Sequence, residues 1–176
     1  MGRSKRSATI IISRRPKLHS RGFGSAPPLG EAATSAEIAR ENGEMTQEEQ
    51  LIRRYFQTFN RHNIEGVMDC FHEDPVLVGA DGLRIEGRAE VRRCYEESFA
   101  SFPDGRCQLR MCTGNDGRAV AESRFWGTRR RDGHVVEAIG AEVIEIADGK
   151  IKEIRDYHKR VTAAVTDSAQ AGDALR

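Results

Sequence analysis

The sequence predicts an α+β domain in which helices come first and a sheet of long antiparallel strands follows. Apolar residues recur at helical spacing from Thr46 to about Phe102, apart from one short hairpin, and from Arg106 the spacing shifts towards two. Three Asp-Gly pairs divide the rest of the chain into four strand-like stretches, as tight antiparallel turns do. Helices followed by such a meander favour α+β over alternating βαβ units.

The first helix is predicted to begin after Thr46 and to end near residues 60–62. Thr46 followed three residues later by Glu49 is a capping-box pattern. The apolar side chains that follow fall on one helical stripe: Leu51, Ile52, Tyr55, Phe56 and Phe59. Asn63 is suited to cap a second, short helix. Its inner face is predicted to hold Ile64, Val67, Met68 and Phe71.

A short hairpin and a third helix are predicted next. Residues 75–78 and 83–85 flank Asp81-Gly82, which is a hairpin signal. The third helix follows Gly87, and Pro103 and Gly105 end it. Its apolar stripe consists of Val91, Cys94, Tyr95, Ser98, Phe99 and Phe102.

The four later strands are separated by residues 115–117, 131–133 and 147–149. Cys107 and Cys112 lie on the first of them, five residues apart, so on a regular strand they would point to opposite faces. None of the four cysteines forms a Cys-x-x-Cys pair. We therefore expect free, mostly buried thiols in a reducing compartment.

The periodic part predicts one domain over residues 45–160. Residues 1–44 carry Arg, Ser, Gly and Pro without a sustained apolar period, which predicts a disordered basic leader. This leader is compatible with a targeting segment, a vector-derived extension or a start upstream of Met45. Residues 161–176 are rich in small side chains and predict a flexible C-terminal tail.

The charge distribution argues against a nucleic-acid or membrane partner. Of the 28 Lys and Arg residues, seven lie in the first 30 positions, where there is no acidic residue. The rest of the chain then has 21 basic against 27 acidic residues, so the domain itself is mildly acidic, whereas nucleic-acid binding needs a basic face. No apolar run approaches the roughly 20 residues that span a bilayer. We expect a cytoplasmic protein.

Several short phrases, in this order, resemble the SnoaL-like, nuclear-transport-factor-2-like family. They are residues 53–60 (RRYFQTFN), 71–74 (FHED) closing the second helix, 85–88 (IEGR), 101–104 (SFPD), 118–121 (RAVA) and 148–151 (DGKI). Together they span about 115 residues. The resemblance implies a cone-shaped half-barrel, with three N-terminal helices packed in a curved, mixed, mainly antiparallel sheet. It says little about activity, because this fold carries cyclases, isomerases, epoxide hydrolases and non-enzymatic modules.

Glu142 and Tyr55 are the first candidate site residues. Glu142 shares a strand face with Ile144 and Ile146, and burial would raise its carboxyl pKa and leave a neutral acid that can donate a hydrogen bond. The alternative is a surface or salt-bridged Glu, and for Tyr55 it is a core tyrosine bonded to backbone. The resemblance implies that both match the oxyanion-hole donors, Tyr and Asp, of ketosteroid isomerases, in which a protonated carboxylic acid donates a hydrogen bond to the substrate. The base of those enzymes would fall near Val78 and Gly79, where no carboxylate stands.

Asp156 and His158 share a face with Ile154 on the last strand. Asp156 falls where the resemblance implies an acidic residue of SnoaL-like polyketide cyclases, although Arg155 replaces the preceding Trp. An Asp beside a His can act as a base held by its partner, or as a purely structural pair.

Four residues are predicted to contact a ligand: Phe59, Phe99, Trp126 and His158. Trp126, the only tryptophan, alternates with Arg124 and Glu122 and would line either the pocket or a dimer surface. Asp69 and His72 lie one helical turn apart, but without an HxH or HExxH pattern we predict no metal site. No cofactor is expected.

Two functional hypotheses follow. In the first, Asp156 is the base and Tyr55 with Glu142 holds the oxyanion during an isomerisation or aldol-type cyclisation of a small apolar carbonyl compound. In the second, the domain is a non-catalytic module that binds a hydrophobic small molecule or dimerises. Phe125 and Val143 are predicted to alternate outward on the sheet, which favours a homodimer packed through that face.

Overall fold

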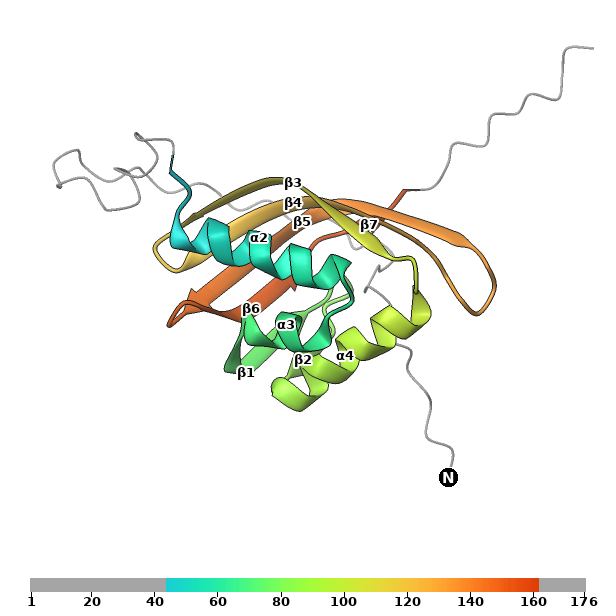
Figure 1. The fold of residues 1–176 in the computed structure, drawn as a ribbon, viewed down its shortest axis with the longest axis horizontal. Coiled ribbons are helices and arrows are strands. Elements are labelled where there is room, and N and C mark those ends of the chain that lie inside the picture. The colour runs from blue at the N-terminus through green and yellow to red at the C-terminus, as the bar shows by residue number, and fades with distance from the viewer. Residues whose placement is uncertain (1–43, 162–176) are drawn as a thin grey trace, which may run out of the picture.

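The computed structural model describes residues 44–161, so the predictions for the basic leader and the C-terminal tail lie almost entirely outside the described residues. Within them, three helices pack on one side of a curved, seven-stranded sheet (Figure 1). The predicted α+β architecture is confirmed. No helix in this part of the chain is both long and apolar enough to cross a bilayer.

The three helices are those that the apolar periods predict. They are α2 (Gln47–Asn60), α3 (Ile64–Asp69) and α4 (Arg88–Ser101). Thr46 caps α2 in a complete capping box, because its side chain accepts from the backbone N–H of Glu49 while the Glu49 side chain accepts from the backbone N–H of Thr46. Asn63 caps α3 through Gly66 N–H.

The sheet is mixed and mainly antiparallel. Its strands are β1 (Phe71–Val78), β2 (Arg84–Glu86), β3 (Arg106–Asn115), β4 (Arg118–Thr128), β5 (Val135–Ala147), β6 (Lys150–Asp156) and β7 (Lys159–Arg160). The spatial order is β2-β1-β6-β5-β4-β3, with β7 also paired to β5. Only β1 and β6 run parallel among these pairs. This crossover brings the end of β1 beside the end of β6.

Two local predictions are wrong, each for a backbone reason. Phe71 and the three residues after it begin β1 instead of closing α3, because Phe71 pairs with Ile151 and the residue before Pro75 is driven towards extended backbone. Cys107 and Cys112 face the same side. An irregularity between Leu109 and Met111 adds one residue to β3, so the two cysteines pair with Phe125 and Ala121, which lie an even four residues apart.

The core lies between the helices and the concave face of the sheet. The prediction that Phe125 points outward is wrong: it is 2% exposed and packs edge-on against Phe102 at 5.3 Å between ring centroids. The opposite face of β3, β4 and β5 carries exposed and half-buried apolar side chains. We name it the outer face and define its apolar members as Met111, Trp126, Val135, Ile139 and Val143.

We predict that the Thr46 cap ties α2 to the sheet. Its hydroxyl accepts from Glu49 N–H at 3.2 Å and donates to the Gly114 carbonyl of β3 at 3.1 Å, in a site only 5% exposed. Thr46→Ala should lower the free energy of unfolding by about 1–2 kcal/mol in urea titrations, as lost caps do. Thr46→Ser, which keeps the hydroxyl, should recover most of this loss. Equal losses in both variants would contradict the cap.

Candidate functional site

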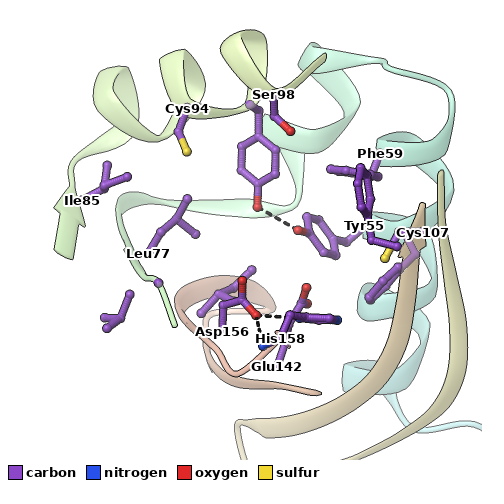
Figure 2. A pocket seen from close by; sticks show the side chains of 16 residues that line it. Tyr55, Phe59, Leu77, Ile85, Cys94, Ser98, Cys107, Glu142, Asp156 and His158 are labelled. Atoms are coloured by element: carbon purple, nitrogen blue, oxygen red, sulfur yellow. Dashed lines mark hydrogen bonds and ion pairs between the residues drawn. The ribbon is translucent and has the colours of Figure 1, made fainter. Parts of the chain in front are cut away.

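A cavity of about 110 Å³ lies between α2, α4 and the concave face of the sheet (Figure 2). Its walls are mostly apolar and aromatic, with a few polar groups, as in small-molecule sites. The lining residues are Tyr55, Phe56, Phe59, Leu77, Val78, Gly79, Ile85, Cys94, Tyr95, Ser98, Cys107, Phe125, Glu142, Ile154, Asp156 and His158.

Five of the predicted site residues meet in this cavity: Tyr55, Phe59, Glu142, Asp156 and His158. Figure 2 shows Tyr55 entering from the helical side, while Glu142 and Asp156 lie next to each other on the sheet side. The residues come from α2, β5, the end of β6 and the short segment between β6 and β7, so the fold brings together positions that are about 100 residues apart in the chain.

Phe99 and Trp126, also predicted to contact a ligand, are not among the residues that line this cavity. Phe99 packs beside the cavity, stacked on His62 at 4.6 Å and edge-on to Phe59 at 5.3 Å. Trp126 is 40% exposed on the outer face, because its neighbour Phe125 points inward and successive strand residues alternate.

The carboxyl groups of Glu142 and Asp156 come from directly opposed residues of β5 and β6. Glu142 as a residue is only partly buried, but its Oε2 is inaccessible to solvent and has no hydrogen-bond partner among the described residues. Burial, and then the nearby charge of Asp156, raises the pKa of Glu142 to about 8, while His158 opposes the shift. Glu142 is therefore largely a neutral acid at pH 7.

His158 holds Asp156 from the other side. Its ring Nδ1 lies 2.6 Å from Asp156 Oδ1, and its backbone N–H donates to the same oxygen at 2.8 Å. His158 is 5% exposed. Burial alone would lower the pKa of His158, but the hydrogen bond and charge of Asp156, with the charge of Glu142, outweigh it and raise the pKa. Both bonds fall on Oδ1, which leaves Oδ2 of Asp156 to accept from a ligand.

The Tyr55 hydroxyl bonds to the Tyr95 hydroxyl at 2.8 Å, and not to backbone as in the alternative interpretation. Both phenols are buried, and burial raises the pKa of each well above its usual value. One of the two donates to the other, which leaves one O–H proton of the pair for a further acceptor. The sequence showed Tyr95 only as part of an apolar stripe, and no local pattern marks it as a partner of Tyr55.

Apart from the ring of His158, whose raised pKa favours its charged form, the polar lining of the cavity is acidic or neutral. It contains two carboxyl groups and the ring of His158, and no Lys or Arg is among its residues. Val78 and Gly79, where the resemblance places a base, do line the cavity but bring no carboxylate. Arg155 points to the outer face, where it pairs with Glu145 at 2.9 Å and Glu153 at 2.5 Å.

Comparison with known proteins places these features in a family. Residues 52–154 match the model of the SnoaL-like domain. No curated protein matches the chain.

Solved structures share the fold at low sequence identity. A proposed SnoaL-like polyketide cyclase from Jannaschia sp. CCS1 superposes with a TM-score of 0.60 at 15% identity, over 73% of this chain and 91% of that one. A proposed ketosteroid isomerase from Kribbella flavida DSM 17836 gives 0.56 at 19% identity, over 74% and 90%. An NTF2-like protein of unknown function from Burkholderia pseudomallei K96243 gives 0.58 at 18%, over 64% and 90%. At these identities the likeness concerns the fold alone.

The raised pKa of Glu142 predicts that stability falls as pH rises. From about pH 4.5 to 8 the unfolded chain loses the Glu142 proton while the folded chain keeps it, so the folded state binds more protons and is progressively destabilised. His158 acts in the same direction, since its stabilisation is complete below its unfolded pKa and is lost as pH rises through its raised folded value.

Glu142→Gln should remove the larger part of this dependence, because an amide has no proton to lose. We expect similar urea midpoints for the two proteins at pH 5, and a higher midpoint for the variant at pH 8. Parallel stability curves for the two proteins from pH 5 to 8 would show that Glu142 is ionised in the fold.

Proposed function

Because the chain belongs to the SnoaL-like domain family, we propose that its cavity binds a small, uncharged, largely apolar carbonyl compound and moves a proton on it by general acid–base catalysis. The observation that carries this proposal is a pair of carboxyl groups in one apolar cavity with unlike surroundings. Glu142 has an enclosed oxygen with no partner among the described residues, whereas Asp156 accepts two N–H donors.

These surroundings assign the two roles. Asp156 is the base: its Oδ2 takes a proton from the carbon next to the carbonyl group, while His158 keeps Oδ1 occupied. The carbonyl oxygen then becomes an enolate oxygen, which accepts hydrogen bonds from neutral Glu142 and from the tyrosine pair. Return of the proton to a different carbon completes an isomerisation. Attack of the enolate carbon on a second carbonyl group, whose oxygen takes up the proton that Asp156 removed, completes an aldol-type cyclisation.

The charge of the cavity supports an uncharged substrate. A carboxylate or phosphate would lose its hydration next to Asp156 and would find no Lys or Arg among the lining residues. The aromatic and aliphatic walls suit the carbon skeleton of the ligand.

A second candidate function is a pocket that binds such a ligand without turnover. The observation in its favour is the absence of a carboxylate at Val78 and Gly79, although both line the cavity. The two candidate functions assign different roles to Asp156 alone, because catalysis needs a base and binding does not.

We also propose that the chain forms a homodimer through the outer face. Its members Met111, Trp126 and Val135 are 46%, 40% and 77% exposed, and they lie on adjacent strands with half-buried Ile139 and Val143. Apolar side chains gathered on one open sheet face are typical of an interface between two copies.

We predict that phenols, which resemble an enolate in shape and polarity, bind in the cavity. Glu142→Met removes the donor at similar side-chain length and should weaken binding roughly ten- to a hundredfold in calorimetric titrations, the equivalent of about 1–3 kcal/mol. Glu142→Gln retains an N–H donor and should lose less. Affinity of the unaltered protein should fall above about pH 8, as Glu142 ionises. Unchanged affinity in Glu142→Met would place the site elsewhere.

We expect the cavity to discriminate by charge. 4-Hydroxyacetophenone is neutral, whereas 4-hydroxybenzoate carries a carboxylate that would face Asp156 with no Lys or Arg in the lining and with His158 already paired to Asp156. The neutral compound should bind at least about tenfold more tightly, because an unpaired charge is costly to desolvate. Tighter binding of the benzoate would contradict an uncharged substrate class.

Deuterium exchange separates the enzyme from the binding module. The protein should accelerate exchange of the α-protons of small cyclic ketones in D₂O, as followed by proton NMR. Asp156→Asn should abolish this acceleration while leaving phenol affinity nearly intact, because it removes the base and keeps the donors. If phenols bind but no ketone exchanges faster than in buffer, the binding module is the better explanation.

The dimer predicts a response to charge in the middle of the outer face. Sedimentation at micromolar concentration should give a dimer, and Val143→Lys should give a monomer because it places a charge in the interface. Glu73→Lys, at an exposed position at the start of β1, is the matched control and should remain dimeric. Emission of Trp126, the only tryptophan, should shift to the red on dissociation. A monomer at every concentration would rule out the assembly.

A further inference from the structure

Ser123 lies behind the cavity, at a position that no sequence pattern singles out. It belongs to β4, is 0% exposed, and is not among the lining residues. A buried hydroxyl needs partners, and Ser123 has two of them. Its Oγ lies 2.8 Å from His158 Nε2 and accepts from the Cys107 thiol at 3.3 Å.

These hydrogen bonds form a continuous chain from Asp156, the proposed base, through His158 to Ser123 on β4. Asp156 Oδ1 meets His158 Nδ1 at 2.6 Å, and His158 Nε2 meets Ser123 Oγ at 2.8 Å. Both ring nitrogens are therefore engaged, and the imidazole cannot turn without breaking two buried hydrogen bonds.

An Asp, a His and a Ser in line also resemble the arrangement of a serine nucleophile with its base. Burial excludes that role here. A nucleophile must reach a substrate carbon, but Ser123 has no exposed surface and the cavity does not extend to it. The hydroxyl acts on the protein, and not on the ligand.

We infer that Ser123 is a positioning residue that works through His158: it fixes the imidazole so that Nδ1–H stays on Asp156 Oδ1 and leaves Oδ2 for the substrate. This inference rests on the proposed role of Asp156 for its consequence in catalysis. The positioning itself is a property of the protein alone.

The hydroxyl can serve His158 in both protonation states. Burial raises the pKa of Cys107 to about 12, so the thiol stays protonated and donates a hydrogen bond to Ser123. Ser123 donates to Nε2 of the neutral ring; beside the imidazolium the hydroxyl turns, accepts from Nε2–H and directs its own proton to the Cys107 sulfur, a weak acceptor. The second bond is charge-assisted and therefore the stronger, so the hydroxyl favours the charged ring.

Other groups also act on His158 and must stay constant in a test. Asp156 lies next to it on its own segment and Glu142 on β5, while Cys107 reaches it only through Ser123. Two neutral phenols face the same cavity from the helices, Tyr55 on α2 and Tyr95 on α4. None of these is changed by a substitution at position 123.

Nitrogen-15 NMR of the histidine rings tests the inference without a ligand. Spectra of the full chain at a pH above the pKa of His158, with His158→Gln for assignment, should show a neutral ring protonated at Nδ1. Ser123→Ala should lower the pKa of His158 by about 0.5–1 unit, because the imidazolium loses its acceptor. Ser123→Thr, which keeps the hydroxyl, should restore the value, and where the added methyl destabilises the fold, Ser123→Cys should give an intermediate one. An unchanged pKa and tautomer in Ser123→Ala would overturn the inference, as would covalent labelling of Ser123 by phenylmethanesulfonyl fluoride.

Catalysis provides the second arm. Ser123→Ala should slow ketone α-proton exchange at least about tenfold and shift its pH profile, with phenol affinity at pH 7 changed by less than about threefold. A purely structural role would lower stability without moving the pH profile. If the unaltered protein binds no phenol and exchanges no ketone, the proposed function fails, whereas the histidine spectra still decide the role of Ser123.

Discussion

The antiparallel register of β5 and β6 is the constraint on which the site depends. It places Ile144 opposite Ile154 and, one step further along the same face, Glu142 opposite Asp156. The isoleucines are 0% and 4% exposed, so the register that buries them also carries two carboxyl groups into the cavity. Two adjacent carboxylates in an apolar setting repel each other, and the protein relieves this by keeping a proton on Glu142 and a histidine against Asp156.

His158 can pack against β5 because the strand has a glycine, Gly140, at the point where the backbone of residues 157–158 passes closest to it. A Cβ on Gly140 would lie 2.5 Å from the Cα of His158 and 2.7 Å from the carbonyl oxygen of Tyr157, distances that side-chain carbons do not tolerate. Gly140 pairs with Ser123 across β4 and β5. The same glycine therefore lets His158 approach and leaves Ser123 as the residue beneath its ring. Acid, base, histidine and serine thus form one structural unit held by the sheet.

Much of this could be predicted from the sequence, because periodicity reports which face is buried. The stripe on α2 placed Tyr55 and Phe59 inside, and alternation on β5 and β6 placed Glu142, Asp156 and His158 on the inner face. Periodicity fails where the backbone departs from regular geometry. The irregularity in β3 places Cys112 on the face opposite to the expected one. On β4, alternation shows that Phe125 and Trp126 lie on opposite faces but does not show which of them points inward, and the prediction for Phe125 was wrong.

Contacts between distant elements leave no local trace. The Tyr55–Tyr95 bond joins residues 40 positions apart, and the Ser123–His158 bond joins residues 35 apart. Trp126 is the only tryptophan, yet the face of β4 on which it lies is set by its neighbour Phe125, whose burial depends on Phe102 in another segment. Side-chain identity alone could not separate these cases, because a buried serine and an exposed tryptophan both depend on what packs opposite.

The proposed chemistry depends above all on a neutral carboxylic acid that stands beside the base in the cavity. Carbon-13 NMR of glutamate carboxyl groups, with Glu142→Gln to assign the signal, measures this protonation directly as pH is varied. We expect one glutamate that titrates with an apparent midpoint near 8. A Glu142 signal that titrates at or below the ordinary value of about 4.5 would show a carboxylate at neutral pH and would contradict the proposed role of this residue.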